Sequence, residues 1–256
     1  MCLSYQENST RVAAASTPAR RAVDRAFRGR AARNGAVYNS VMTAADLRPQ
    51  QLPSGRHGLM RSYVQANQRE RILAAVAGAA AELGYPEMSV EAVIARAGVS
   101  RRTFYEHFKN KEDAFLAAYD AVVRRQARHI RGAYFEETTV LDRLRAGIRA
   151  YLRFLADEPG LARMCVVEVF AAGPRALARR SEAMRMFAEI IEDNIHELLP
   201  GCQRAALTAE TIVGGIHEVV FSRVLADRID ELPGMADDLL TAILMLDLGA
   251  GAKFKT

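Results

Sequence analysis

Apolar residues recur at helical spacing from about residue 62 onward. In the segment 62–83 they fall on one face of a helix, at Ile72, Leu73, Val76, Ala80 and Leu83. Gly84 and Pro86 follow directly, and both are typical of a helix end. This pattern predicts an amphipathic helix over 62–83.

Two short helices and one long helix are predicted next. Ser89 is a candidate N-cap for a helix through Ala97, after which Gly98 breaks the pattern. Ser100 is then expected to cap a helix that runs to about Phe108. Asn110 is expected to cap a longer helix that runs to about Phe135.

The rest of the chain is predicted to be helical as well. Pro and Gly stand between its periodic segments, and no alternating strand pattern is present. The expected helices cover residues 139–156, 159–171, 174–199, 204–228 and 235–250. The fold class is therefore all-α.

The charge is uneven along the chain. Residues 1–60 contain nine Arg and three acidic residues, although the whole chain has a formal charge of only +5. Their composition favours a disordered basic N-terminal segment. The Arg-rich stretch 11–33 also resembles an organellar transit peptide, and translation that begins at Met42 is a further alternative.

Composition argues against several classes of protein. The three cysteines are scattered without CxxC spacing, which predicts neither disulfides nor a zinc site and fits a cytoplasmic protein. No apolar run reaches the length of a membrane span, and no signal-peptide core follows the start. Nucleophile, phosphate-loop and zinc-protease motifs are missing, so neither a catalytic site nor a cofactor or metal is expected.

The stretch from Ser89 to Lys111 is typical of a helix-turn-helix. Its apolar side chains, Val93, Ile94, Val99, Phe104 and Phe108, are expected to pack together and to hold the second short helix. The opposite face of that helix is expected to carry Arg101, Arg102, Thr103, Tyr105, His107 and Lys109. Such groups read base edges and grip phosphates when a recognition helix enters the major groove.

Residues 98–120, GVSRRTFYEHFKNKEDAFLAAYD, resemble the signature of the TetR family, and residues 67–85 resemble its first helix. The resemblance implies a DNA-binding domain over 61–110 and a helical ligand-sensing and dimerisation domain over 111–256. It implies DNA contacts for Arg101, Arg102, Thr103, Tyr105 and His107. It also implies that Lys111 grips a phosphate.

The function implied is a homodimeric repressor on a pseudo-palindromic DNA operator, relieved by an unknown small-molecule effector. An activator, a regulator without ligand and, in another class, a helical enzyme are the alternatives. The resemblance further implies that the helices at 204–228 and 235–250 form the dimer interface. Their apolar positions are Ile212, Val213, Ile216, Val219, Val220, Leu239, Leu240, Ile243, Leu244, Leu246 and Leu248.

Several smaller features favour structural roles. The pairs Glu192/His196 and Asp193/Glu197 are expected on a solvated helix face, and His217 is expected to be packed, with a pocket position as the alternative. Cys165 is expected to be a buried thiol and Glu168 a surface acid. Residues 53–58 with Arg61 are either a minor-groove arm or a flexible leader. Aromatic and Met side chains that form the core, or in part line a cavity, are Tyr119, Tyr134, Phe135, Tyr151, Phe154, Met164, Phe170, Met184, Met186 and Phe187.

Overall fold

The computed structural model describes residues 61–249, and every regular element in that range is a helix, as predicted. The α-helices are α2 (Arg61–Leu83), α3 (Val90–Ala97), α4 (Arg101–His107), α5 (Lys111–Glu136), α6 (Val140–Asp157), α7 (Pro159–Val166), α8 (Pro174–Leu198), α9 (Ala205–Leu225) and α10 (Ala236–Gly249). Two short 3₁₀ helices are η2 (Glu168–Phe170) and η3 (Ile229–Met235).

The predicted caps are confirmed. The side-chain oxygens of Ser89, Ser100 and Asn110 accept hydrogen bonds from backbone N–H groups in the first turns of α3, α4 and α5. Each cap satisfies a donor that has no partner within its helix. Gly98 ends α3 with a φ of 60°, in the left-handed region that glycine adopts at little cost.

Two predicted helices end earlier than the sequence suggested. The segment 159–171 is α7 followed by η2, and the segment 204–228 stops at Leu225. Asp227 then adopts a φ of 59°, which breaks the helical path before η3. Leu83 was assigned to the buried face of α2, but it is 45% exposed at the end of that helix.

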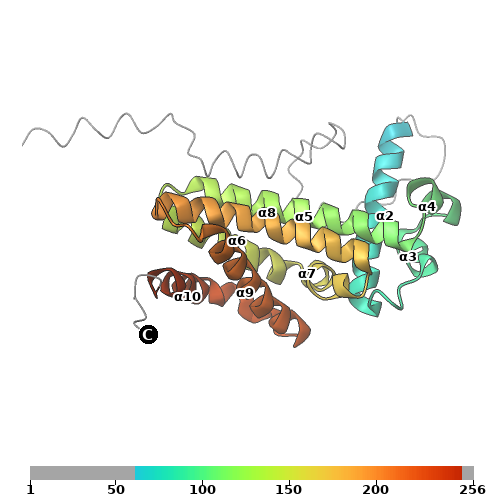
Figure 1. The fold of residues 1–256 in the computed structure, drawn as a ribbon. Helices are drawn as coiled ribbons and strands as arrows, with labels where there is room; N and C mark the ends of the chain where they lie inside the picture. The colour runs from blue at the N-terminus through green and yellow to red at the C-terminus, as the bar shows by residue number, and fades with distance from the viewer. Residues whose placement is uncertain (1–60, 250–256) are drawn as a thin grey trace, which may run out of the picture.

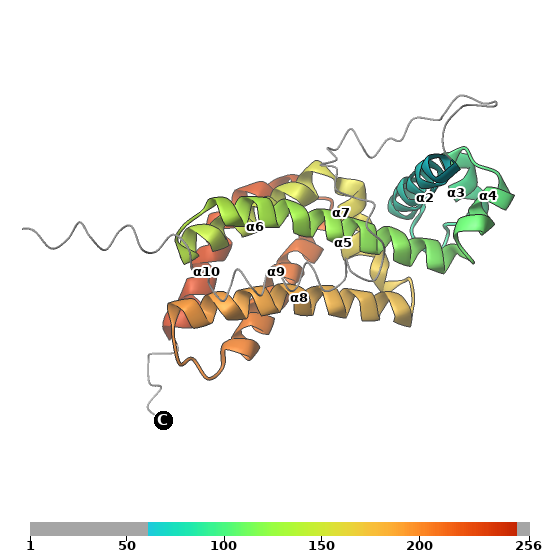
Figure 2. The ribbon, with the colours of Figure 1, turned by 90° about the horizontal axis from the view of Figure 1, so that it is seen from above.

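The helices form an elongated bundle with α2, α3 and α4 at one end (Figure 1). Helices α5 and α8 run along its length, and α5 reaches into the end that α2–α4 occupy (Figures 1 and 2). Helix α6 packs mainly on α5, and α9 packs mainly on α8. No helix within residues 61–249 is long and apolar enough to cross a membrane.

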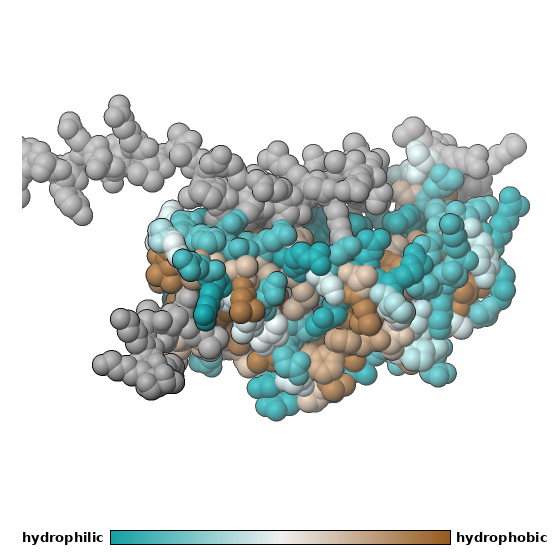
Figure 3. Space-filling model, viewed as in Figure 1, coloured by the Kyte–Doolittle hydropathy of each residue, from teal (hydrophilic) through white to brown (hydrophobic). Residues whose placement is uncertain are grey.

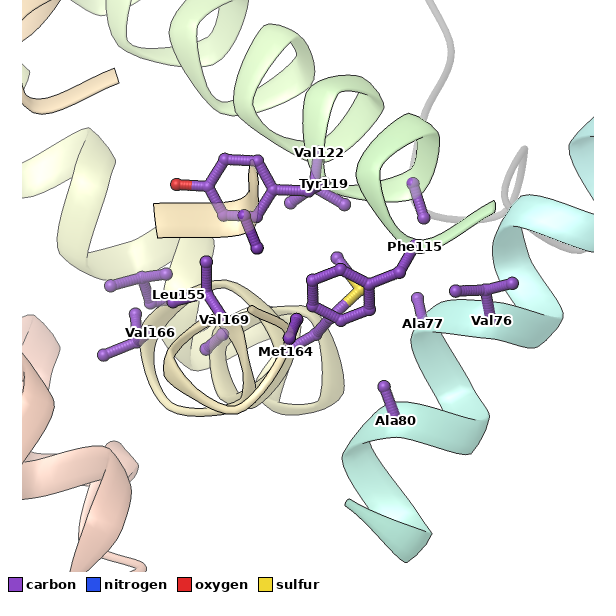
Figure 4. Packing of buried hydrophobic residues seen from close by; sticks show 14 of the residues in the cluster. Val76, Ala77, Ala80, Phe115, Tyr119, Val122, Leu155, Met164, Val166 and Val169 are labelled. Carbon is purple, nitrogen blue, oxygen red and sulfur yellow. The ribbon is translucent and has the colours of Figure 1, made fainter. Parts of the chain in front are cut away.

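One continuous core joins the two ends of the bundle. Phe115 of α5 and Met164 of α7 are fully buried and lie close to Val76 and Ala80 of α2 (Figure 4). Close-packed cores transmit displacement because they contain few voids. A displacement of α7 would therefore be transmitted directly to α2.

Some predictions lie outside the described residues. These are the basic segment 1–60, including the start at Met42, and the arm at 53–58. The side chains of Arg61, Leu246 and Leu248 lie outside as well.

Candidate nucleic-acid interface and effector cavity

Helix α4 is anchored through its aromatic side chains. Phe104 and Phe108 are buried, with ring centroids 5.9 Å apart, and they pack in one cluster with the buried Val93 of α3. Arg71 of α2 donates hydrogen bonds to the carbonyl oxygens of Ala97 and Gly98, at the turn between α3 and α4. These contacts fix the orientation of α4, so its opposite face is presented rigidly.

That opposite face carries hydrogen-bonding groups. The Arg102 side chain is 90% exposed, and its Nε lies 3.0 Å from Oε1 of Glu106 on the same helix. Tyr105 is 49% exposed. The Thr103 hydroxyl lies 2.9 Å from that of Ser100 and is exposed. Arg102 and Tyr105 therefore project from α4, and the exposed ion pair of Arg102 is with a residue of the same helix.

Arg101 differs from Arg102 in its partner. Its guanidinium pairs with the Glu91 carboxylate of α3, although both side chains remain more than half exposed. An exposed ion pair contributes little stability and is easily exchanged for another anion. Arg101 is thus available to a phosphate at small cost.

His107 is only partly accessible. Burial lowers the pKa of His107, and the nearby Arg69 guanidinium lowers it further, while Glu106 opposes both. Its Nε2 is buried without a hydrogen-bond partner among the described residues. Near neutral pH His107 is therefore an uncharged group at the edge of α4.

Lys111 is already hydrogen-bonded within the chain. Its ammonium nitrogen donates to the carbonyl oxygens of Tyr85, Pro86 and Met88 at 3.1, 3.0 and 2.9 Å, and it lies 4.7 Å from the Tyr85 ring centre. An ammonium group has three N–H donors, and these three carbonyls occupy them. Lys111 thus fastens the turn between α2 and α3 to the start of α5, and the phosphate contact expected of it stays a prediction.

Glu168 requires a correction, since it is buried rather than at the surface. One carboxylate oxygen accepts the backbone N–H of Tyr85 at 2.8 Å, and the other lies 3.5 Å from Nε of Arg163. The same turn contains Gly84, which has a φ of 79°. A carboxylate from η2 and an ammonium group from α5 thus hold the α2–α3 turn from two sides.

A cavity of about 130 Å³ lies among α5, α6, α7, α8 and α9. Most of its wall is apolar, with Ile148 of α6 and Ile216 of α9 as examples. Five members of the predicted aromatic and Met set line it, namely Tyr119, Tyr134, Tyr151, Met184 and Phe187. Its polar lining includes Cys165 and His217, which the sequence favoured as packed side chains, with a pocket position as the alternative for His217.

Two arginines in the cavity wall were missed by sequence reasoning. Arg143 of α6 and Arg180 of α8 both stand in amphipathic helices that are rich in arginine, so nothing in the sequence distinguished them from surface residues. Arg143 is buried and pairs with Glu197 at 2.6 Å. Within residues 61–249 Arg180 forms no such pair, and it is considered below.

Metal ligands do not converge within residues 61–249, where no group of three or more suitable side chains occurs. Glu192 and His196 lie 3.8 Å apart on a largely solvated face of α8, as the sequence indicated.

Comparison with known proteins agrees with this arrangement. Residues 72–118 match the sequence model of the bacterial regulatory proteins of the tetR family. The fatty acid metabolism regulator protein of Bacillus subtilis is 22% identical over 179 residues, which cover 68% of this chain and 92% of that protein. The transcriptional activator FasR of Mycolicibacterium smegmatis is 22% identical over 161 residues, which cover 63% of this chain and 72% of FasR.

The fold is similar to that of FadR from Bacillus subtilis in complex with stearoyl-CoA. The TM-score is 0.63 at 22% identity, over 68% of this chain and 96% of FadR. The relatives and the matched domain are DNA-binding transcriptional regulators rather than enzymes. Residues 72–118 of this chain therefore match the DNA-binding region of the tetR family, and its helical bundle has the fold of FadR.

Proposed function

We propose that the protein is a homodimeric repressor that binds a pseudo-palindromic operator and releases it when a small molecule occupies the cavity. The observation that carries this proposal is the way in which α4 is anchored in the domain. Buried Phe104 and Phe108 hold the helix, while Arg102 and Tyr105 project from its free face. A rigid helix with exposed donors at its N-terminal end suits entry into the major groove.

The proposed contacts divide into two kinds. Arg102 suits a bidentate contact to a guanine edge, because its long side chain is nearly free. Arg101, Thr103 and Tyr105 suit phosphates beside the groove. His107 stays in the set as a neutral hydrogen-bonding group, and Lys111 leaves it because its ammonium is already bound.

Exposed apolar side chains on α9 and α10 support the dimer. Leu207 and Leu225 of α9 are 64% and 55% exposed, and Met245 of α10 is 68% exposed. The backbone of Gly214 and Gly215 on α9 has open space where a side chain would stand, so another helix can approach closely. Apolar residues gather over α9 on the face seen in Figure 3, whereas the α4 end is largely hydrophilic.

Part of the apolar pattern predicted for the interface is used inside the subunit. Ile212, Val220 and Leu240 are each at most 3% exposed and belong to the core of one chain. The proposed interface, which we call the α9–α10 face, therefore consists of Leu207, Gly214, Gly215, Leu225 and Met245.

The cavity supports regulation by a ligand with an apolar part. The relative of similar fold was solved with stearoyl-CoA, which favours an acyl compound as effector here. The cavity lies beside α7, and α7 packs on α2. A ligand that displaces α7 can therefore alter the position of the DNA-binding end. Activation of transcription is the second candidate function, because the relative FasR is a transcriptional activator.

The experiment is a binding and transcription assay with the DNA upstream of the protein's own gene. Fluorescence anisotropy should show specific binding, and footprinting should show two protected half-sites about one helical turn apart. In vitro transcription from that promoter should fall when the protein is added. A rise in transcript would favour activation, and equal affinity for random DNA would contradict operator recognition.

A further inference from the structure

Polar side chains from α5, α6, α7, α8 and α9 line the cavity. Arg180 Nη2 lies 3.1 Å from Nδ1 of His217, and both residues line the cavity with Tyr119, Tyr151 and Cys165. We call these five residues the Arg180 cluster.

The Arg180 cluster carries a positive charge that no acid offsets. In the part of the chain that the structure describes, no carboxylate lies within ion-pair distance of Arg180. Its guanidinium is covered instead by the Phe170 ring at 4.9 Å, and its Nε is buried without a hydrogen-bond partner. A cation among apolar walls is costly unless an anion reaches it.

Arg143, the other arginine of the cavity, differs from Arg180 in having a carboxylate beside its charge, although the Nε of each is buried without a hydrogen-bond partner among the described residues. Its Nη2 pairs with Oε1 of Glu197 at 2.6 Å, and it stacks on Tyr134. The Tyr134 hydroxyl in turn donates to Asn194 at 2.7 Å. Among the described residues, the charge of Arg143 is therefore offset by a carboxylate, whereas that of Arg180 is not.

The neighbours of Arg180 are neutral donors or acceptors. Burial, reinforced by the Arg180 charge, lowers the pKa of His217 to about 4. Because the guanidinium must donate, His217 Nδ1 accepts and Nε2 holds the ring hydrogen. Burial raises the pKa of Tyr119, Tyr151 and Cys165, so their O–H and S–H groups stay protonated.

We propose that Arg180 binds the carboxylate of an apolar monocarboxylic acid, whose hydrocarbon part fills the rest of the cavity. The guanidinium supplies parallel N–H donors, to which a carboxylate is the matching acceptor. The Tyr119 and Tyr151 hydroxyls stand in the same cluster as further donors. This inference rests on the proposed function, in which the cavity holds the effector.

The volume of the cavity limits the length of the acid that it can hold. The cavity of about 130 Å³ is close to the engineered cavity of about 150 Å³ that holds benzene, and it is smaller than most drug-sized sites. An acid such as hexanoate fits this scale. A CoA thioester of the same acid has no carboxylate at the acyl end, so it would leave Arg180 without an anion.

The test compares hexanoate, hexan-1-ol and hexanoyl-CoA by calorimetry on the full chain. The three ligands share the hydrocarbon part and differ in the group that meets Arg180. We expect hexanoate to bind more tightly than hexan-1-ol by on the order of tenfold to a hundredfold, as for a charge-assisted hydrogen bond. Equal binding of acid and alcohol, or binding of the thioester alone, would overturn the proposal.

Substitutions of Arg180 then test whether the difference in affinity between hexanoate and hexan-1-ol depends on its guanidinium group. Arg180→Met should remove the preference for hexanoate over hexan-1-ol, and Arg180→Lys should restore part of it. Arg185→Met is the matched control, because Arg185 is an exposed arginine of the same helix. Unchanged hexanoate binding by Arg180→Met would overturn the assignment. If Arg180→Met does not fold, the comparison of acid with alcohol on the natural chain still decides the proposal.

Operator affinity in the same titrations separates this inference from the proposed function. Binding of hexanoate through Arg180 without release of DNA would support the carboxylate site and contradict effector-relieved repression. Release of DNA by hexanoyl-CoA, with no binding of hexanoate, would support the proposed function and overturn the carboxylate site.

Discussion

At the residue scale, the side chains of α4 differ chiefly in the partners they already have. Arg101 is paired with Glu91 of the neighbouring helix, and His107 is partly buried and neutral. Arg102 is nearly free, with a single contact to Glu106 within its own helix. Arg102 is therefore the side chain whose loss should change DNA recognition with the least effect on folding.

Arg102→Ala should weaken operator binding by about 1–3 kcal/mol and leave the unfolding transition unchanged. The measurement is affinity for the operator and for random DNA at one salt concentration, beside thermal unfolding. Arg185→Ala, on the exposed face of α8, is the control for loss of one positive charge. Equal losses on both DNAs would identify a phosphate contact rather than a base contact.

His217 gives the ligand-free protein a stability that depends on pH. Its folded-state pKa is lowered to about 4, so the folded protein takes up a proton less readily than the unfolded chain. The unfolding free energy should therefore fall as pH drops from about 6.5 toward 4, with a loss from His217 of about 2 kcal/mol at pH 5. Urea unfolding at pH 7 and pH 5 measures this loss.

His217→Gln should reduce that loss, since glutamine has no proton to take up in this range. His107, whose pKa is also lowered, contributes in the same direction and remains in the variant. Identical pH dependence of the natural and variant proteins would mean that His217 is not the responsible group.

At the element scale, local signals were readable from the sequence and distant ones were not. Ser89, Ser100 and Asn110 cap helices that begin next to them, so a few residues of context were enough. Glu168 accepts from Tyr85, which lies 83 positions earlier in the chain. Nothing near Glu168 in the sequence reveals that partner, and an acid at helical spacing is ordinarily exposed.

Glu168→Ala should loosen the α2–α3 turn, because the Tyr85 N–H then loses its acceptor. We expect an unfolding free energy lower by about 1–3 kcal/mol, and faster hydrogen exchange at the Tyr85 amide. Glu168→Gln is the matched control, since its amide oxygen still accepts from that N–H. Slow exchange at Tyr85 in the alanine variant would show that the turn does not depend on Glu168.

Lys111→Met tests the second contact on this turn. The variant keeps most of the apolar length of lysine but loses the three donors to Tyr85, Pro86 and Met88. We expect a lower unfolding temperature, with an unchanged slope of log affinity for DNA against log salt concentration. If the variant keeps the full unfolding temperature and its slope of log affinity against log salt is smaller by about one unit, Lys111 contacts a phosphate.

At the scale of the whole molecule, the sequence located the apolar helices but not the direction in which each apolar side chain points. Helix α9 is apolar around most of its circumference, so periodicity alone could not separate the face that meets the core from the face that meets a partner. Val220 proves to be in the core and Leu207 at the surface. The cavity could not be predicted from the sequence either, because α5, α6, α7, α8 and α9 enclose it jointly.

Leu207→Asp combined with Met245→Asp should convert the proposed dimer to a monomer while each subunit stays folded. A carboxylate buried in an apolar contact without a partner is costly, whereas the same group is well solvated on a free surface. Light scattering gives the mass in solution, and operator affinity should fall with it, because two half-sites are then read separately.

Leu240→Asp serves as the contrast in that experiment. Leu240 is only 3% exposed within one subunit, so an aspartate there should unfold the chain rather than dissociate a dimer. If the double variant at Leu207 and Met245 remains dimeric, the dimer interface does not lie on the α9–α10 face.

The empty space among the helices has a consequence for how the protein responds to hydrostatic pressure. Unfolding eliminates internal voids, and a void of about 130 Å³ adds tens of mL/mol to the volume that the chain loses when it unfolds. Compression should therefore favour the unfolded chain, and a molecule that fills the cavity should remove much of that sensitivity. The midpoint pressure of unfolding, followed with and without a bound compound, thus reports how completely the compound occupies the interior.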